Sequence, residues 1–123
     1  MIDIKLGDYH KEVPPCNDLA TCLEFVLTWG DASEDNVDLV RVCSAAIGVA
    51  LDPEALLPKY RPDRDKILQY GRKILTRLLL KNIPMKDIYD SGSAYLTAMA
   101  QNIPQQKEVE EKMDFFPSAE EDD

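Results

Sequence analysis

The chain has 123 residues, 45% of them hydrophobic, and a formal net charge of −9. This length suits one domain with its own core, and the near-average apolar content argues against wholesale disorder. No apolar run approaches the roughly 20 residues that cross a bilayer, and the N-terminus lacks the pattern of a secretory signal. We therefore expect a cytoplasmic protein without membrane contact, whose negative field repels nucleic-acid phosphates.

Residues 2–6 alternate between apolar and charged side chains, which is typical of a strand with one buried face. Gly7 and Asp8 suit a two-residue turn, and residues 9–13 can return as a second strand before Pro14-Pro15 ends the ladder. We expect a β-hairpin arm here. Because two strands alone are marginally stable, the arm must lean on the helices or pair with another chain.

Two helices are expected next. The first begins near Asn17 or Asp18, either of which can cap its free amides, and ends at Gly30. The second covers about residues 36–51 and is apolar on nearly every side, which predicts the central, most buried helix. Residues 52–62 contain three prolines and form a connector.

A third helix, from Pro62 or Asp63 to Lys81, has the clearest pattern. Its apolar face comprises Ile67, Leu68, Ile74, Leu75, Leu78 and Leu79. The opposite side carries the basic stripe, which comprises Lys66, Lys73, Arg77 and Lys81. Leu80 falls among these bases, where we expect something to cover it. A mid-helix glycine costs about 1 kcal/mol relative to alanine, so Gly71 indicates close approach by another helix.

The tripeptide Asn-Ile-Pro occurs at residues 82–84 and 102–104, each time after a helix. Asparagine tolerates the left-handed conformation that ends many helices, and proline suits the first turn of the next one. A fourth helix is expected between the two copies, over about residues 85–101. Its Ser91-Gly92-Ser93 segment should weaken its middle.

The predicted fold is mainly α, a single domain of four to five helices with a short N-terminal β-hairpin. Residues 1–113 form this domain, with the hairpin arm over residues 1–15 and the helices within 16–113. The last helix is short and strongly charged, over about residues 105–113. Residues 114–123 form an acidic C-terminal tail.

Residues that could carry chemistry are few. The sequence contains no glycine-rich phosphate loop, nucleophile elbow or metal-binding histidine pair. Cysteines 16, 22 and 43 could join His10 in a zinc site, but none has the short spacing that paired zinc ligands usually share. We predict no metal, no cofactor and no catalytic residue, hence a protein that is not an enzyme. An active site assembled from distant residues would leave no local signature.

Charges are sorted along the chain. Residues 59–81 hold eight bases and two acids, whereas residues 1–58 hold eleven acids and residues 101–123 hold eight. The basic stripe is either a solvated helix face or a docking strip for carboxylates. Acidic C-terminal residues of the same chain or of a second copy are candidate occupants, so one expectation is a homo-oligomer built head to tail.

Phe115 and Phe116 stand beside many acids near the C-terminus. The pair is either an anchor that pins the terminus to the core or a short motif presented to a basic groove of a partner. We favour the anchor.

The two ends of the chain resemble a known kind of protein. The opening stretch is Ile4-Lys5-Leu6-Gly7-Asp8-Tyr9 with Pro14-Pro15, and the closing one is Glu108-Val109-Glu110-Glu111 followed by Asp114-Phe115-Phe116. Both resemble small morphogenesis proteins of tailed bacteriophages, with the tail-assembly chaperones as the nearest group. The resemblance implies a small helical protein that keeps the tape-measure protein soluble in the bacterial host cytoplasm.

The expected function is therefore that of a non-enzymatic phage or prophage assembly factor, a tail-assembly chaperone that binds a tape-measure or tail protein. Its physical basis would be an apolar groove between helices, with the charged segments setting on-rate and self-association. The alternative is an acidic regulator or inhibitor that imitates nucleic acid. That alternative requires the carboxylates to form one continuous surface with phosphate-like spacing.

Overall fold

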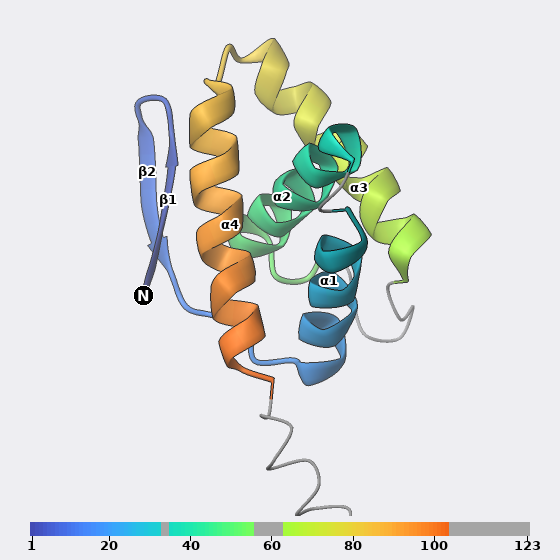
Figure 1. The fold of residues 1–123 in the computed structure, drawn as a ribbon. Coiled ribbons are helices and arrows are strands. Elements are labelled where there is room, and N and C mark those ends of the chain that lie inside the picture. Colours follow the sequence, from blue (N-terminus) through green and yellow to red (C-terminus); the bar gives the residue numbers. More distant parts are fainter. Residues whose placement is uncertain (33–34, 56–62, 104–123) are drawn as a thin grey trace, which may run out of the picture.

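The structure is a computed structural model that describes residues 1–32, 35–55 and 63–103. Its elements are β1 (Ile2–Leu6), β2 (Tyr9–Val13), α1 (Leu19–Ala32), α2 (Asn36–Leu51), α3 (Arg64–Leu80) and α4 (Met85–Gln101). The predicted mainly α fold with an N-terminal β-hairpin is confirmed (Figure 1). The expected fifth helix and acidic tail lie outside the described residues.

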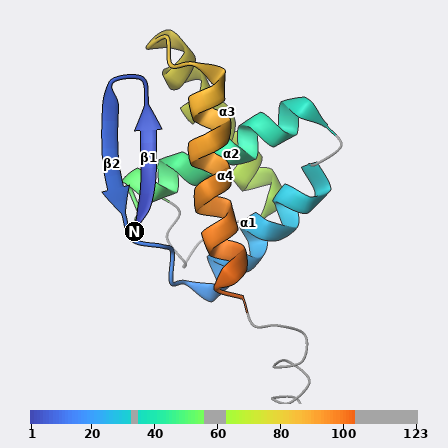
Figure 2. The same ribbon diagram turned by 60° about the vertical axis from the view of Figure 1, so that its left-hand side comes forward.

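Helix α2 occupies the centre of the fold. It packs against α1, α3 and α4, and every residue from 42 to 50 is buried (Figures 1 and 2). The prediction that this would be the most buried helix is therefore confirmed. Helix α4 lies beside the hairpin, and α3 starts on the side of the molecule away from the hairpin and runs towards the start of α4 (Figure 1).

The hairpin is fastened to α4 by hydrogen bonds from strand β1, which pairs with β2 in antiparallel register. The Lys5 N–H donates to Ser91 Oγ at 2.9 Å, and that hydroxyl donates to the Lys5 carbonyl oxygen at 3.0 Å. The Gly7 N–H donates to Asp87 Oδ2 at 2.8 Å. Ser91 therefore satisfies both backbone polar groups of Lys5 at the outer edge of β1 and joins the hairpin to α4.

Two glycines allow α2 to lie against its neighbours. A Cβ atom on Gly71 of α3 would lie 1.9 Å from the carbonyl oxygen of Arg41. A Cβ atom on Gly92 of α4 would lie 2.7 Å from the carbonyl oxygen of Cys43. Both distances are shorter than any tolerated contact, so these positions require glycine. The close approach predicted at Gly71 is confirmed.

The helix ends differ from expectation in two places. Helix α1 continues through Gly30 to Ala32, and burial of the Ala32 side chain holds this last turn against the core. Asn82 has the expected left-handed conformation, with φ of 60°, but Asn102 is right-handed, with φ of −82°. The Asn102 side chain instead donates to the Cys16 carbonyl oxygen at 2.9 Å, which ties the end of α4 to the segment that precedes α1.

Replacing Gly71 by alanine should lower the free energy of unfolding by about 1–3 kcal/mol, the usual cost of overpacking. Gly30→Ala is the matched control, because a Cβ atom there meets nothing within 4 Å. It should leave stability unchanged or raise it by up to about 1 kcal/mol, since alanine favours the helix. Urea unfolding followed by circular dichroism measures both changes. Equal effects of the two substitutions would contradict the close packing of α3 on α2.

Candidate functional site

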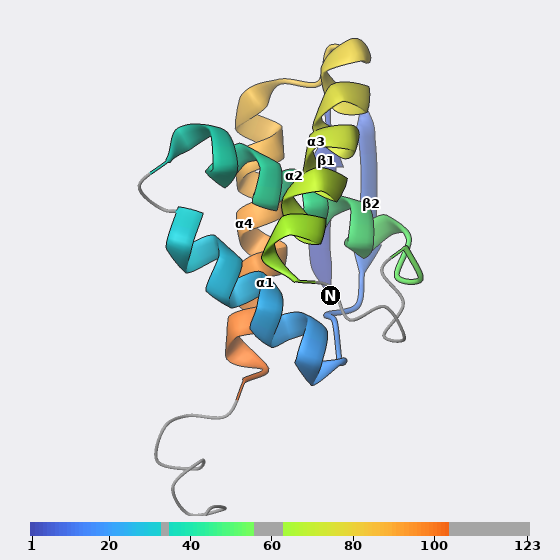
Figure 3. The ribbon, with the colours of Figure 1, turned by 90° about the vertical axis from the view of Figure 1, so that its right-hand side faces the viewer.

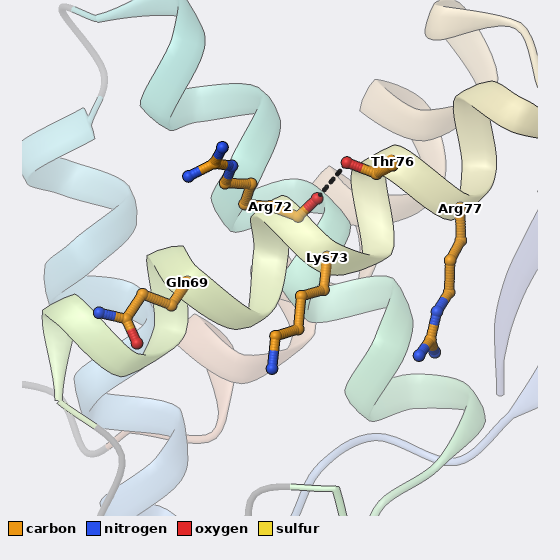
Figure 4. Close-up of a pocket in the computed structure, with 5 residues that line it drawn as sticks. All are labelled: Gln69, Arg72, Lys73, Thr76 and Arg77. Atoms are coloured by element: carbon orange, nitrogen blue, oxygen red, sulfur yellow. Dashed lines mark hydrogen bonds between the residues drawn. The ribbon is translucent and has the colours of Figure 1, made fainter.

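The candidate site is the outer side of α3. The described residues that line an open hollow of about 610 Å³ there are Gln69, Arg72, Lys73, Thr76 and Arg77 (Figure 4). We call these five residues the α3 strip. Lys73 and Arg77 extend to the same side of the helix, whereas Arg72 projects towards the other edge (Figure 4).

The amphipathic sequence of α3 explains why these residues face outward. Ile67 and Leu78 are buried on the inner side, and Gly71 lies against α2. With the inner side fixed in this way, the bases on the other side of the helix must project into solvent. The Asp63 side chain caps the helix by accepting from the Lys66 N–H at 2.9 Å, so α3 begins where the sequence predicted.

The strip is positive because none of the described acids pairs with its bases. The described ion pairs use other bases, namely His10, Arg41, Arg64 and Lys86. Within the described ranges, no carboxylate lies at ion-pair distance from Arg72, Lys73 or Arg77. Burial and then Asp52 raise the pKa of Tyr70, and the positive charge of Arg77 partly offsets this rise.

The structure brings together only part of the predicted basic stripe. Lys73 and Arg77 line the hollow, whereas Lys66 lies one turn before it and Lys81 follows the end of α3. Sequence reasoning missed Arg72, although its place beside Lys73 within the densest basic segment was a usable signal. The predicted partner residues Phe115 and Phe116 lie outside the described residues.

Leu80 stands apart from the apolar face of α3. It is 78% exposed, so none of the described residues provides the cover that the sequence led us to expect. Leu79 is also exposed, at the edge of the same side. The outer side of α3 thus combines unneutralised bases with large apolar side chains, a composition suited to an amphipathic segment of another polypeptide.

Cys16 and Cys22 are neighbours, whereas Cys43 lies beside Ser93, and the described cysteines lack the features of a metal site. Among the described residues, no group of three or more histidine, cysteine or acidic side chains is placed to hold a metal ion. Burial raises the pKa of the Cys22 thiol to about 11, and the neighbouring Cys16 thiol contributes to the rise. Burial also raises the pKa of Cys43. These shifts indicate protonated core thiols and not activated nucleophiles.

Comparison with known proteins identified no relative of this chain. No family model, curated protein or solved structure matches the chain. Over the ranges that the structure describes, none of the helices combines the length and apolar character needed to span a bilayer.

Alkylation with iodoacetamide should show the shielding of Cys22. At pH 8 only about one thiol in a thousand is ionised when its pKa is about 11, so Cys22 should react far more slowly than the half-exposed Cys16. Mass spectrometry of the digested protein measures both rates.

The same pKa shift has a consequence for stability. Folded Cys22 holds its proton to a higher pH than the unfolded thiol, whose ordinary pKa is 9.0. The stability that this provides is present below pH 9 and is lost as the pH rises towards 11.

The alkylation experiment can contradict the buried position of Cys22. Equal rates for Cys16 and Cys22 in the folded protein at pH 8 would do so.

Proposed function

We propose that the protein is a non-enzymatic assembly factor that holds an acidic, partly apolar segment of another polypeptide on the α3 strip. The observation that carries the proposal is the hollow lined by Arg72, Lys73 and Arg77, none of which has a described carboxylate at ion-pair distance. Arginine suits carboxylate ligands because its planar guanidinium donates two parallel hydrogen bonds.

The chemistry of this surface fits reversible holding. Exposed charge pairs contribute up to about 1 kcal/mol each, but complementary fields speed the encounter of two partners. The exposed Leu80 beside the bases offers apolar contact to the same segment. A surface of this kind binds quickly and releases readily, which an assembly chaperone requires.

The resemblance of the chain ends to phage morphogenesis proteins points to a particular partner. The proposed role is that of a tail-assembly chaperone of a phage or prophage, and the partner would be a tape-measure or tail protein. The absence of catalytic motifs from the sequence is in keeping with a binding role. This assignment rests on the terminal residues, whereas the binding mode rests on the α3 strip.

The described carboxylates do not favour the alternative of a nucleic-acid mimic. Several are used locally: Asp35 and Asp63 cap helices, Asp87 accepts from the hairpin, and Asp31 lies 3.4 Å from Arg64. A mimic requires acids that stand free in an unbroken row. These acids instead hold the fold together.

A labelled helical peptide with glutamate and leucine on one face is a suitable probe for the strip. It should bind the wild-type protein at low salt and more weakly as salt rises, because salt screens exposed charges. The triple variant Arg72→Gln/Lys73→Gln/Arg77→Gln should weaken binding at least about tenfold, which corresponds to 1.4 kcal/mol. Fluorescence anisotropy measures the affinity.

The matched control removes the same number of positive charges elsewhere, as Lys5→Gln/Lys11→Gln/Lys86→Gln. It should retain nearly wild-type binding, and both variants should unfold within about 0.5 kcal/mol of the wild type, since all six positions are exposed. Equal loss of binding in the two variants would show that net charge and not the strip attracts the peptide.

The partner assignment calls for its own experiment. Co-expression with the tape-measure protein of the same phage or prophage should raise the soluble fraction of that protein, and the strip variant should raise it less. Sedimentation of cell lysates measures the soluble fraction. A tape-measure protein that stays insoluble with the wild-type chain would contradict the tail-assembly role while leaving peptide binding by the strip intact.

A further inference from the structure

Helix α1 presents an apolar face to solvent. Leu19, Leu23 and Leu27 follow one another at four-residue intervals and are 52%, 44% and 54% exposed. Gly30 continues the same side of the helix, and a Cβ atom there would meet nothing within 4 Å. We call Leu19, Leu23, Leu27 and Gly30 the α1 face. Three large side chains in one helical row, ending in a glycine, form a surface that another helix can approach closely.

The charges beside this face restrict what can cover it. Glu24 and Asp31 lie along one edge of the row, and residues 18–32 contain no lysine, arginine or histidine. Two α1 faces packed together would bring these acids near one another, and of the two only Asp31 has a described base, Arg64, at ion-pair distance. A surface with both apolar and basic side chains therefore suits this face better than a second α1 face does.

Helix α3 has this composition. Its outer side combines Leu79 and Leu80 with the bases Arg72, Lys73 and Arg77 of the α3 strip. Charge and apolar character are thus complementary between two surfaces of one chain. We infer that the α1 face of one copy packs on the α3 strip of a second copy.

The positions of the two helices require a second copy. Helices α1 and α3 lie on the same side of the molecule, and Arg64 reaches Asp31 at 3.4 Å between them (Figure 3). Both surfaces are exposed in a single copy, so neither covers the other within one chain. Because the contact joins two different surfaces, it closes into a reciprocal pair or a ring, or extends into a filament.

Self-association also bears on the proposed function. The α3 strip serves both contacts, so an acidic partner segment and the α1 face of a neighbouring copy compete for it. This competition rests on the proposed function, whereas the association of copies does not. Binding of a partner would then release the copies from one another.

Two variants test the contact by sedimentation velocity of the full chain. Leu27→Asp alters the α1 face, and Leu80→Asp alters the outer side of α3; both side chains are at least half exposed, so the fold should tolerate the changes. The wild type should associate, and each variant alone should associate at least about tenfold more weakly. A mixture of the two variants should regain a pair, because one supplies an intact α3 strip and the other an intact α1 face.

The control is Thr97→Asp, which adds the same charge at an exposed position on α4 and should associate like the wild type. A wild-type protein that stays monomeric would overturn the inference, as would variants that associate normally or a mixture that forms no pair. The peptide probe keeps this test separate from the proposed function. Leu27→Asp leaves the α3 strip unaltered and should bind that peptide at least as tightly as the wild type does.

Discussion

The close packing of α2 between α3 and α4 determines what the rest of the molecule can present. At Gly71 and Gly92 the neighbouring helices approach the α2 backbone so nearly that any side chain would overlap with it. This contact fixes the rotation of α3 about its own axis, because Ile67 and Leu78 must then face inward. The outward direction of Arg72, Lys73 and Arg77 thus follows from the absence of a side chain at Gly71.

The two exposed surfaces contribute different kinds of free energy. Full burial of a leucine side chain is worth about 1.5–3 kcal/mol, so the half-exposed row on α1 offers affinity to whatever covers it. The bases of α3 contribute less per contact, because exposed ion pairs gain at most about 1 kcal/mol. They contribute orientation and speed of encounter instead. A chain with both surfaces can select its occupants by charge and retain them by apolar contact.

The sequence was sufficient to predict the helices and the hairpin, but not which of their side chains are exposed. Periodicity predicted every described helix and the hairpin, since core-facing residues recur at fixed intervals along each. It could not show that Leu19, Leu23 and Leu27 are exposed, because α1 is apolar on two sides and only its packing decides which side is covered. The two helix ends that the sequence did not predict also depend on tertiary packing. Burial of Ala32 extends α1, and the Asn102 side chain donates to the Cys16 carbonyl oxygen. In the strip, spacing identified Lys73 and Arg77 but not the hollow that adds Arg72.

The net charge of −9 makes the proposed association of copies depend on how its charges are distributed. Two copies repel one another at long range, and only local complementarity between α1 and α3 offsets this repulsion. Salt weakens both the long-range repulsion and the local attraction between charges, because the Debye length falls to about 8 Å at physiological ionic strength. Contact between leucines is not screened in this way. The part of the association that survives at high salt therefore reflects Leu19, Leu23, Leu27 and Leu80, and the part that is lost reflects the balance between the bases of the strip and the acids around them.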